Sequence, residues 1–170
     1  MTVANNKLYE VIEKHKDELI TEICNRLQKL SSSHYEMIDF ERHQEREEEF
    51  LDIIIKVIHE NNERPLKIYM ENLARQRSNE GYSLEEVQNA IRIFEEEFWD
   101  ILVTHYPVSK ELVELLTDCN MVFGLARDYF AQYYMDKTIA MQNELNSLKE
   151  RFYKYKQGRK DLTGNEAVDQ

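Results

Sequence analysis

The stretch NEGYSLEEVQNAIRIFEEEFWDILVTH, residues 79–105, decides the fold. Gly81 lacks a Cβ and adopts positive φ at little cost, which suits the residue that ends a helix. Ser83 and Glu86 have the spacing of a capping box, in which each side chain bonds a backbone N–H at the start of the next helix. The stretch therefore predicts two helices joined by a tight turn. The apolar face of the second helix comprises Val87, Ile91, Phe94, Phe98, Ile101 and Leu102.

Working outward from this turn, apolar residues recur at the three- and four-residue steps of amphipathic helices. We expect helices over about residues 6–30 and 40–60, a third that starts at Pro65, and a last one capped by Ser109. The serines at 31–33 favour a break. With only four Gly and two Pro in 170 residues, the composition suits long helices with few turns. The chain is predicted to be all-α, a bundle of about five helices.

The last helix is predicted to continue past the bundle, because no Gly or Pro occurs between Tyr133 and Gly158. Beyond the bundle its apolar pattern thins to Ile139 or Met141, followed by Leu145, Leu148 and Phe152 at roughly heptad spacing. Such a narrow seam is most simply buried against a second copy, so we expect a homodimer. The expected organisation is a bundle over 1–136, a helical coiled-coil connector over 137–158 and a disordered tail over 159–170.

Charge is uneven along the chain. The total is −11, but residues 1–136 carry −13 and residues 137–160 carry +5. An acidic body repels nucleic acid and anionic membrane, so neither is expected as a partner; the basic and aromatic segment 149–160 is the one alternative contact. No stretch approaches the roughly 18 apolar residues of a membrane span. Two isolated cysteines, Cys24 and Cys119, fit a reducing compartment, so the protein is expected to be cytoplasmic.

Motifs for catalysis or tight metal binding are missing from the sequence. It contains no H-E-x-x-H, no Glu-x-x-His pair and no glycine-rich phosphate loop. We therefore expect no metal site, no resident cofactor and no enzymatic activity. The acidic run Glu95, Glu96 and Glu97 is interpreted as a solvated face.

Two groups of residues are the candidates for a small ligand. His15 lies on the buried stripe of the first helix and is interpreted as a core histidine; alternatively, it holds a haem or another planar ligand, with His105 as a second contact. Tyr129 and Tyr133 belong to an aromatic cluster that core packing explains. The alternative for this cluster is an apolar pocket whose hydroxyls orient a ligand.

The run ENLARQRSNEGYSLEEVQNAIR, residues 71–92, resembles the amino-terminal input domain of RsbT co-antagonist proteins of the RsbRD type. The matching residues are Arg77, Gly81, Tyr82, Ser83, Leu84, Val87 and Ile91. The helix order agrees over roughly residues 8–137. The resemblance implies a signal-input (sensor) domain, without catalytic residues, that biases a phosphorylation-dependent stress or two-component pathway. Its partner would be an output domain or a regulatory protein.

No output module is recognised after Lys160, so the chain is expected to be an isolated input domain or a free-standing relative. Together, the sequence predicts a dimeric regulatory input or docking module that signals through its C-terminal helix. The alternative is a helical bundle that binds haem or another small ligand.

Overall fold

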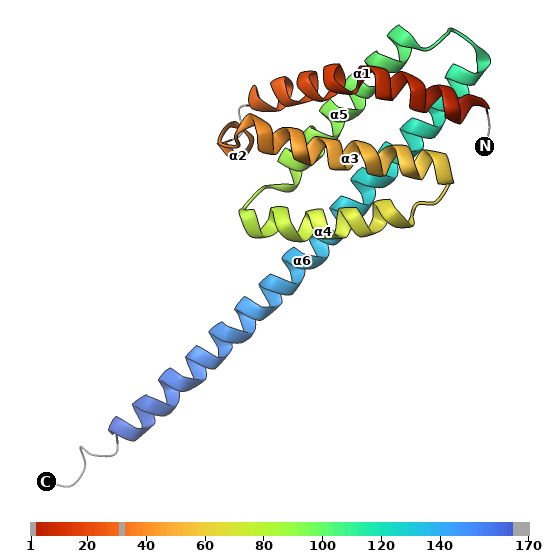
Figure 1. The fold of residues 1–170 in the computed structure, drawn as a ribbon. Coiled ribbons are helices and arrows are strands. Elements are labelled where there is room, and N and C mark those ends of the chain that lie inside the picture. Colours follow the sequence, from red (N-terminus) through yellow and green to blue (C-terminus); the bar gives the residue numbers. More distant parts are fainter. Residues whose placement is uncertain (1–2, 31–32, 165–170) are drawn as a thin grey trace, which may run out of the picture. The chain divides into compact units, whose positions relative to one another are not determined.

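The described part of the chain folds into six helices and no strand (Figure 1). The computed structural model describes residues 3–30 and 33–164, with the side chains of residues 7–30 and 34–157. The all-α prediction is confirmed. The helices are α1 (Val3–Gln28), α2 (Ser33–Glu36), α3 (Phe40–Glu60), α4 (Arg64–Glu80), α5 (Leu84–His105) and α6 (Lys110–Gly164).

The expected helices are all present, and α2 is an addition to them. The predicted break at 31–33 falls largely on residues 31 and 32, which lie outside the described residues. The four-residue α2 follows. With four residues, α2 is too short for an apolar period to appear in its sequence. Its helical conformation is stabilised by contacts with other helices. Tyr35 is buried, and its carbonyl accepts a hydrogen bond of 2.9 Å from Nε2 of the buried His43 on α3.

Helix α1 is kinked at His15, whose backbone angles are φ −115° and ψ 15°. Two helical segments meet at this residue. Kinks usually occur at Pro or Gly, and the sequence around His15 has neither. The periodic apolar pattern continues across the kink, so no local pattern predicts it.

Capping residues mark several of the other helix boundaries. Asp39 accepts a hydrogen bond of 2.8 Å from the backbone N–H of Arg42 at the start of α3. The hydroxyl of Ser109 accepts one of 3.3 Å from the N–H of Leu112 at the start of α6, as predicted. Asn61 ends α3 in the left-handed conformation with φ 48°, which Asn tolerates better than most residues.

Four phenylalanines from three helices fill the centre of the core. Phe123 of α6 packs against Phe50 of α3 and against Phe94 and Phe98 of α5, with ring centroids 5.7 to 6.3 Å apart. Around this centre α1 packs against α3 and α5, and α3 packs against α4 (Figure 1). Aromatic side chains bury the largest apolar areas, and this cluster joins α6 to α3 and α5.

The chain divides into two compact units, Met1–Tyr134 and Met135–Gln170. The first unit holds the core and includes residues 110–134 of α6. In the second unit α6 continues to Gly164 and so includes residues 159–164, which the sequence assigned to a disordered tail. The rest of that predicted tail, residues 165–170, lies outside the described residues. None of the described helices is both long enough and apolar enough to cross a bilayer.

Candidate functional site

The turn between α4 and α5 has the predicted geometry. Gly81 has φ 86°, in the left-handed region. The hydroxyl of Ser83 accepts a hydrogen bond of 3.2 Å from the N–H of Glu86, and the carboxylate of Glu86 accepts one of 2.6 Å from the N–H of Ser83. Both halves of the capping box are therefore formed, and the turn is confirmed.

This turn also connects parts of the first unit that are distant in sequence. His34 on α2 donates a hydrogen bond of 2.9 Å from Nδ1 to the Glu86 carboxylate. The ring of Tyr82 stacks on His34 and meets Tyr35 edge-on. The hydroxyl of Tyr134, on α6, donates a hydrogen bond of 2.7 Å to the Tyr82 carbonyl. The turn thus joins α2, α4, α5 and α6.

Next to the turn, a small polar cavity of about 30 Å³ opens between α2, α3, α4 and α5, enough for one or two water molecules. Arg77 lines it and is only 4% exposed. Its Nη1 donates a hydrogen bond of 2.8 Å to Glu80, which also lies 3.6 Å from Nη2 of Arg46. Nε of Arg77 and Nη1 of Arg46 are buried without a hydrogen-bond partner. The cavity therefore contains guanidinium N–H groups that can still donate hydrogen bonds. Its other lining residues are Tyr35, Glu47, Phe50, Tyr69, Leu73, Val87, Ala90 and Ile91.

Glu47 is the acidic group in this cavity. Burial raises the pKa of its carboxyl from the ordinary 4.5 to about 7, although Arg77 and Arg46 oppose the change. The other ionisable groups that face it are the tyrosines Tyr35 and Tyr69. The charge of the cavity therefore changes near neutral pH through Glu47.

Replacing Glu47 with Gln is expected to stabilise the protein at pH 8 and to change it little at pH 5. In the folded state the Glu47 carboxyl keeps its proton up to about pH 7, whereas in the unfolded chain the same carboxyl loses it near pH 4.5. Ionisation therefore removes stability as the pH rises through this window. Gln imitates the protonated acid and has no such loss. Thermal melts of both proteins at the two pH values measure this difference. An equal Tm difference at pH 5 and pH 8 would contradict the prediction.

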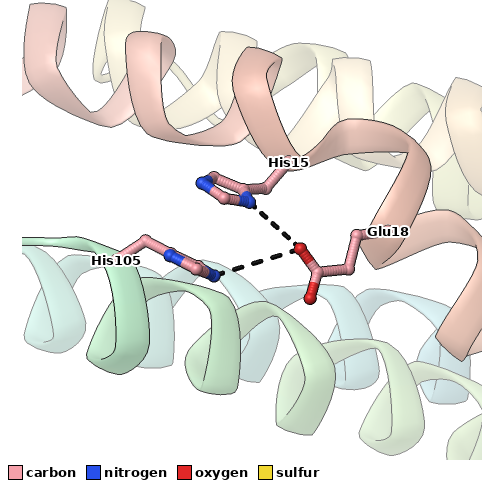
Figure 2. A group of neighbouring side chains, drawn as sticks. All are labelled: His15, Glu18 and His105. Carbon is pink, nitrogen blue, oxygen red and sulfur yellow. Dashed lines mark hydrogen bonds and ion pairs between the residues drawn. The ribbon is translucent and has the colours of Figure 1, made fainter.

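Figure 2 shows the second polar group, made of His15 and Glu18 on α1 and His105 at the end of α5. The two imidazole rings stack with centroids 3.6 Å apart and 15° between their planes. Nδ1 of His15 lies 3.0 Å from Oε2 of Glu18, and Nε2 of His105 lies 4.0 Å from the same oxygen. The side chains are 15%, 56% and 30% exposed for His15, Glu18 and His105 respectively, so the group is open to solvent on one side.

The sequence named both histidines, and the structure places them in direct contact. His15 packs on His105 rather than in the apolar core. A haem held by both would have to separate the two rings, which now fill the space between their helices. The haem alternative stays an untested prediction.

Tyr129 and Tyr133, the other predicted ligand candidates, lie at the edge of the core on α6 and are half-buried. Nζ of Lys67 lies 5.7 Å above the Tyr129 ring. Partial burial and a hydrogen bond to Glu63 raise the pKa of the Tyr129 hydroxyl. Tyr129 thus links α6 to the start of α4, in agreement with the packing interpretation.

The acidic run on α5 forms ion pairs with arginines of other helices. Its interpretation as a solvated face is therefore incomplete. Arg26 of α1 lies 2.5 Å from Glu96 and 2.6 Å from Glu97. Arg127 of α6 pairs with Glu95. The side chains of Glu95 and Glu97 are largely buried. The run therefore fixes α5 between α1 and α6, and only the tertiary structure brings these partners together.

The predicted interaction residues Leu145, Leu148 and Phe152 lie on the second unit. They are 46%, 55% and 55% exposed. The structure contains one chain, so their burial in a dimer stays a prediction.

The sequence could not reveal the cavity or the place of Glu18 beside the two histidines, because neither follows a local motif. Arginine is rarely buried, and Arg77 was noted only for the family resemblance. Glu18, an exposed acidic residue on a helix, had no distinguishing pattern.

The fold and these sites describe an all-α domain in which buried polar groups join the helices. Residues 17–137 match the family model for the RsbT co-antagonist protein rsbRD N-terminal domain. The chain therefore belongs to the RsbRD N-terminal domain family, and the resemblance seen in the sequence is confirmed. Membership places it among regulatory input domains of stress pathways. Comparison with curated proteins and with solved structures gave no match.

Proposed function

We propose that this chain is a dimeric, non-enzymatic signal-input module of a bacterial stress or two-component type pathway, acting in the cytoplasm. The first unit responds to a cue. The C-terminal part of α6 pairs with a second copy and passes the response to an output domain or a regulatory protein. This proposal rests mainly on the exposed apolar seam of the second unit.

The seam follows heptad spacing over residues 141–155, with steps of four, three, four and three. Each of its side chains is between 46% and 66% exposed. Such a stripe on a single helix is the pattern that coiled coils bury between chains. A helix without tertiary partners is marginal in water, so pairing would also supply its stability. The seam residues are Met141, Leu145, Leu148, Phe152 and Tyr155.

The role of α6 as a connector is supported by the residues that it supplies to each unit. Phe123 and Phe130 are fully buried in the first unit, and the seam belongs to the second. A change in how α6 packs against the core would therefore act on the helix that carries the dimer contacts. The Tyr134 hydrogen bond to Tyr82 ties α6 to the α4–α5 turn at the last residue of the first unit.

The double variant Leu145→Asp with Leu148→Asp is expected to weaken dimerisation strongly, because it places four carboxylates in one dimer seam. Sedimentation of the full chain over a range of concentrations measures the association constant. Asn143→Asp with Asn146→Asp is the matched control, because this pair adds the same charge about 140–160° around the helix from the seam. Dimerisation that survives in the double variant as well as in the control would contradict the proposed seam.

A further inference from the structure

We infer that His15, Glu18 and His105 form a binding site for a divalent transition-metal ion of the Zn²⁺ class. This inference goes beyond the proposed function and does not depend on dimerisation. Two imidazoles and one carboxylate are a ligand set that suits Zn²⁺, Ni²⁺, Co²⁺ or Fe²⁺. Mg²⁺ and Ca²⁺ take oxygen ligands and would gain only Glu18.

The geometry brings together one potential ligand atom from each residue, all within 4.8 Å of one another. In a tetrahedral site with bonds of about 2.0–2.1 Å, ligand atoms lie about 3.4 Å apart. The contact between His15 and Glu18 is already this close, at 3.0 Å. His105 Nε2 lies 4.0 Å from the same carboxylate oxygen and has to approach it as the ring turns. Among the residues that the structure describes, this is the one group of three such ligands.

Metal binding would require the rings to leave their parallel stack. An ion bound to an imidazole lies close to the ring plane, and two planes only 15° apart at a separation of 3.6 Å cannot both contain it. His105 is the residue able to turn. It is the last residue of α5, and Tyr106 after it has extended backbone angles of φ −88° and ψ 138°. The Glu18 side chain is 56% exposed, which gives an ion access to its carboxylate.

The position of the site links metal binding to the rest of the domain. His15 is the kink of α1, where the backbone leaves the helical conformation. His105 precedes the loop to α6, which begins at Lys110. An ion held by all three ligands would therefore fix the kinked point of α1 to the segment that leads into α6.

The cysteines will not compete for the ion in a binding experiment. Cys24 and Cys119 are buried, and burial raises the pKa of each thiol to about 12. Metal ions bind the thiolate form, which is scarce at neutral pH when the pKa is so high. Because both thiols are also buried, Zn²⁺ bound by the folded protein is expected on imidazole and carboxylate ligands.

The test is titration of the full chain, free of any affinity tag, with Zn²⁺ by calorimetry and with Co²⁺ by visible absorbance. The wild type is expected to bind one ion per chain, to show the Co²⁺ ligand-field bands of a low-coordinate site, and to show no heat with Mg²⁺. Glu18→Gln changes an exposed side chain and should leave the thermal melt nearly unchanged without metal. His105→Ala also removes the ring stacked on His15, so its melt without metal is recorded to show that the variant is folded. Each should weaken Zn²⁺ binding by more than about tenfold, since loss of even an outer-shell partner costs that much.

His59→Ala is the matched control, because His59 is an exposed histidine at the end of α3, outside the group. It should bind Zn²⁺ like the wild type. The inference is overturned if the wild type shows no saturable binding. It is equally overturned if Glu18→Gln and His105→Ala bind as tightly as His59→Ala. Neither result bears on dimerisation, which is measured without metal.

Discussion

Phe123→Ala is expected to lower the free energy of unfolding by about 3–5 kcal/mol, the usual cost of removing a fully buried aromatic ring. Phe123 is 0% exposed and touches three other phenylalanines. These neighbours are held by α3 and α5, so they cannot collapse fully into the space that the ring leaves. Urea denaturation followed by circular dichroism measures the change.

Met121→Ala is the control for Phe123, because Met121 lies two residues away on α6 and is 54% exposed. It should change the free energy of unfolding by less than about 0.5 kcal/mol. Phe123→Leu keeps most of the apolar volume and should cost less than Phe123→Ala, which keeps the test usable if the alanine variant does not fold. Equal costs for Phe123→Ala and Met121→Ala would contradict the assigned core.

Arg77→Ala is expected to destabilise the domain by about 2–3 kcal/mol, because it removes a buried, hydrogen-bonded charged group, while its partner Glu80 stays part-exposed. The loss has three parts: the ion pair with Glu80, the contact of the guanidinium with the Tyr82 ring at 4.7 Å, and the packing of the side-chain stem. Removing Arg77 also removes a cation that favours ionised Glu47. The pKa of Glu47 should therefore rise further in the variant.

The matched control for Arg77 is Arg75→Ala. Arg75 lies two residues earlier on α4, its side chain is 61% exposed, and it pairs with Glu71 at the surface. Exposed pairs of this kind contribute about 0.3–0.5 kcal/mol. Chemical denaturation of both variants measures the difference. A cost for Arg77→Ala as small as that of Arg75→Ala would show that the buried position is not a source of stability.

Local signals in the sequence were sufficient to predict most of the helices. The Gly81 turn and the caps at Ser83 and Ser109 act within one helical turn, so their residues are visible as neighbours in the sequence. The apolar period over 40–60 predicted the bounds of α3 as the structure has them. The four-residue α2 was missed because it is held by Tyr35 and His43 rather than by its own pattern.

The candidate sites were less predictable, since their geometry arises from tertiary packing. His15 and His105 were named as one pair, but the sequence could not show that their rings stack or that Glu18 joins them. The ion pairs of Arg26 with Glu96 and Glu97 likewise depend on how α1 and α5 pack. Charged residues on helices have the same sequence signature whether they are solvated or paired.

Light scattering during size-exclusion chromatography of the full chain and of a version that ends at Asp136 tests the proposed dimeric input module most directly. The full chain is expected to have twice its monomer mass of 20.5 kDa. The shorter chain retains the whole of the first unit and is expected to run as a folded monomer. If both proteins are monomers, or if both are dimers, signalling through a dimer of the C-terminal helix is contradicted.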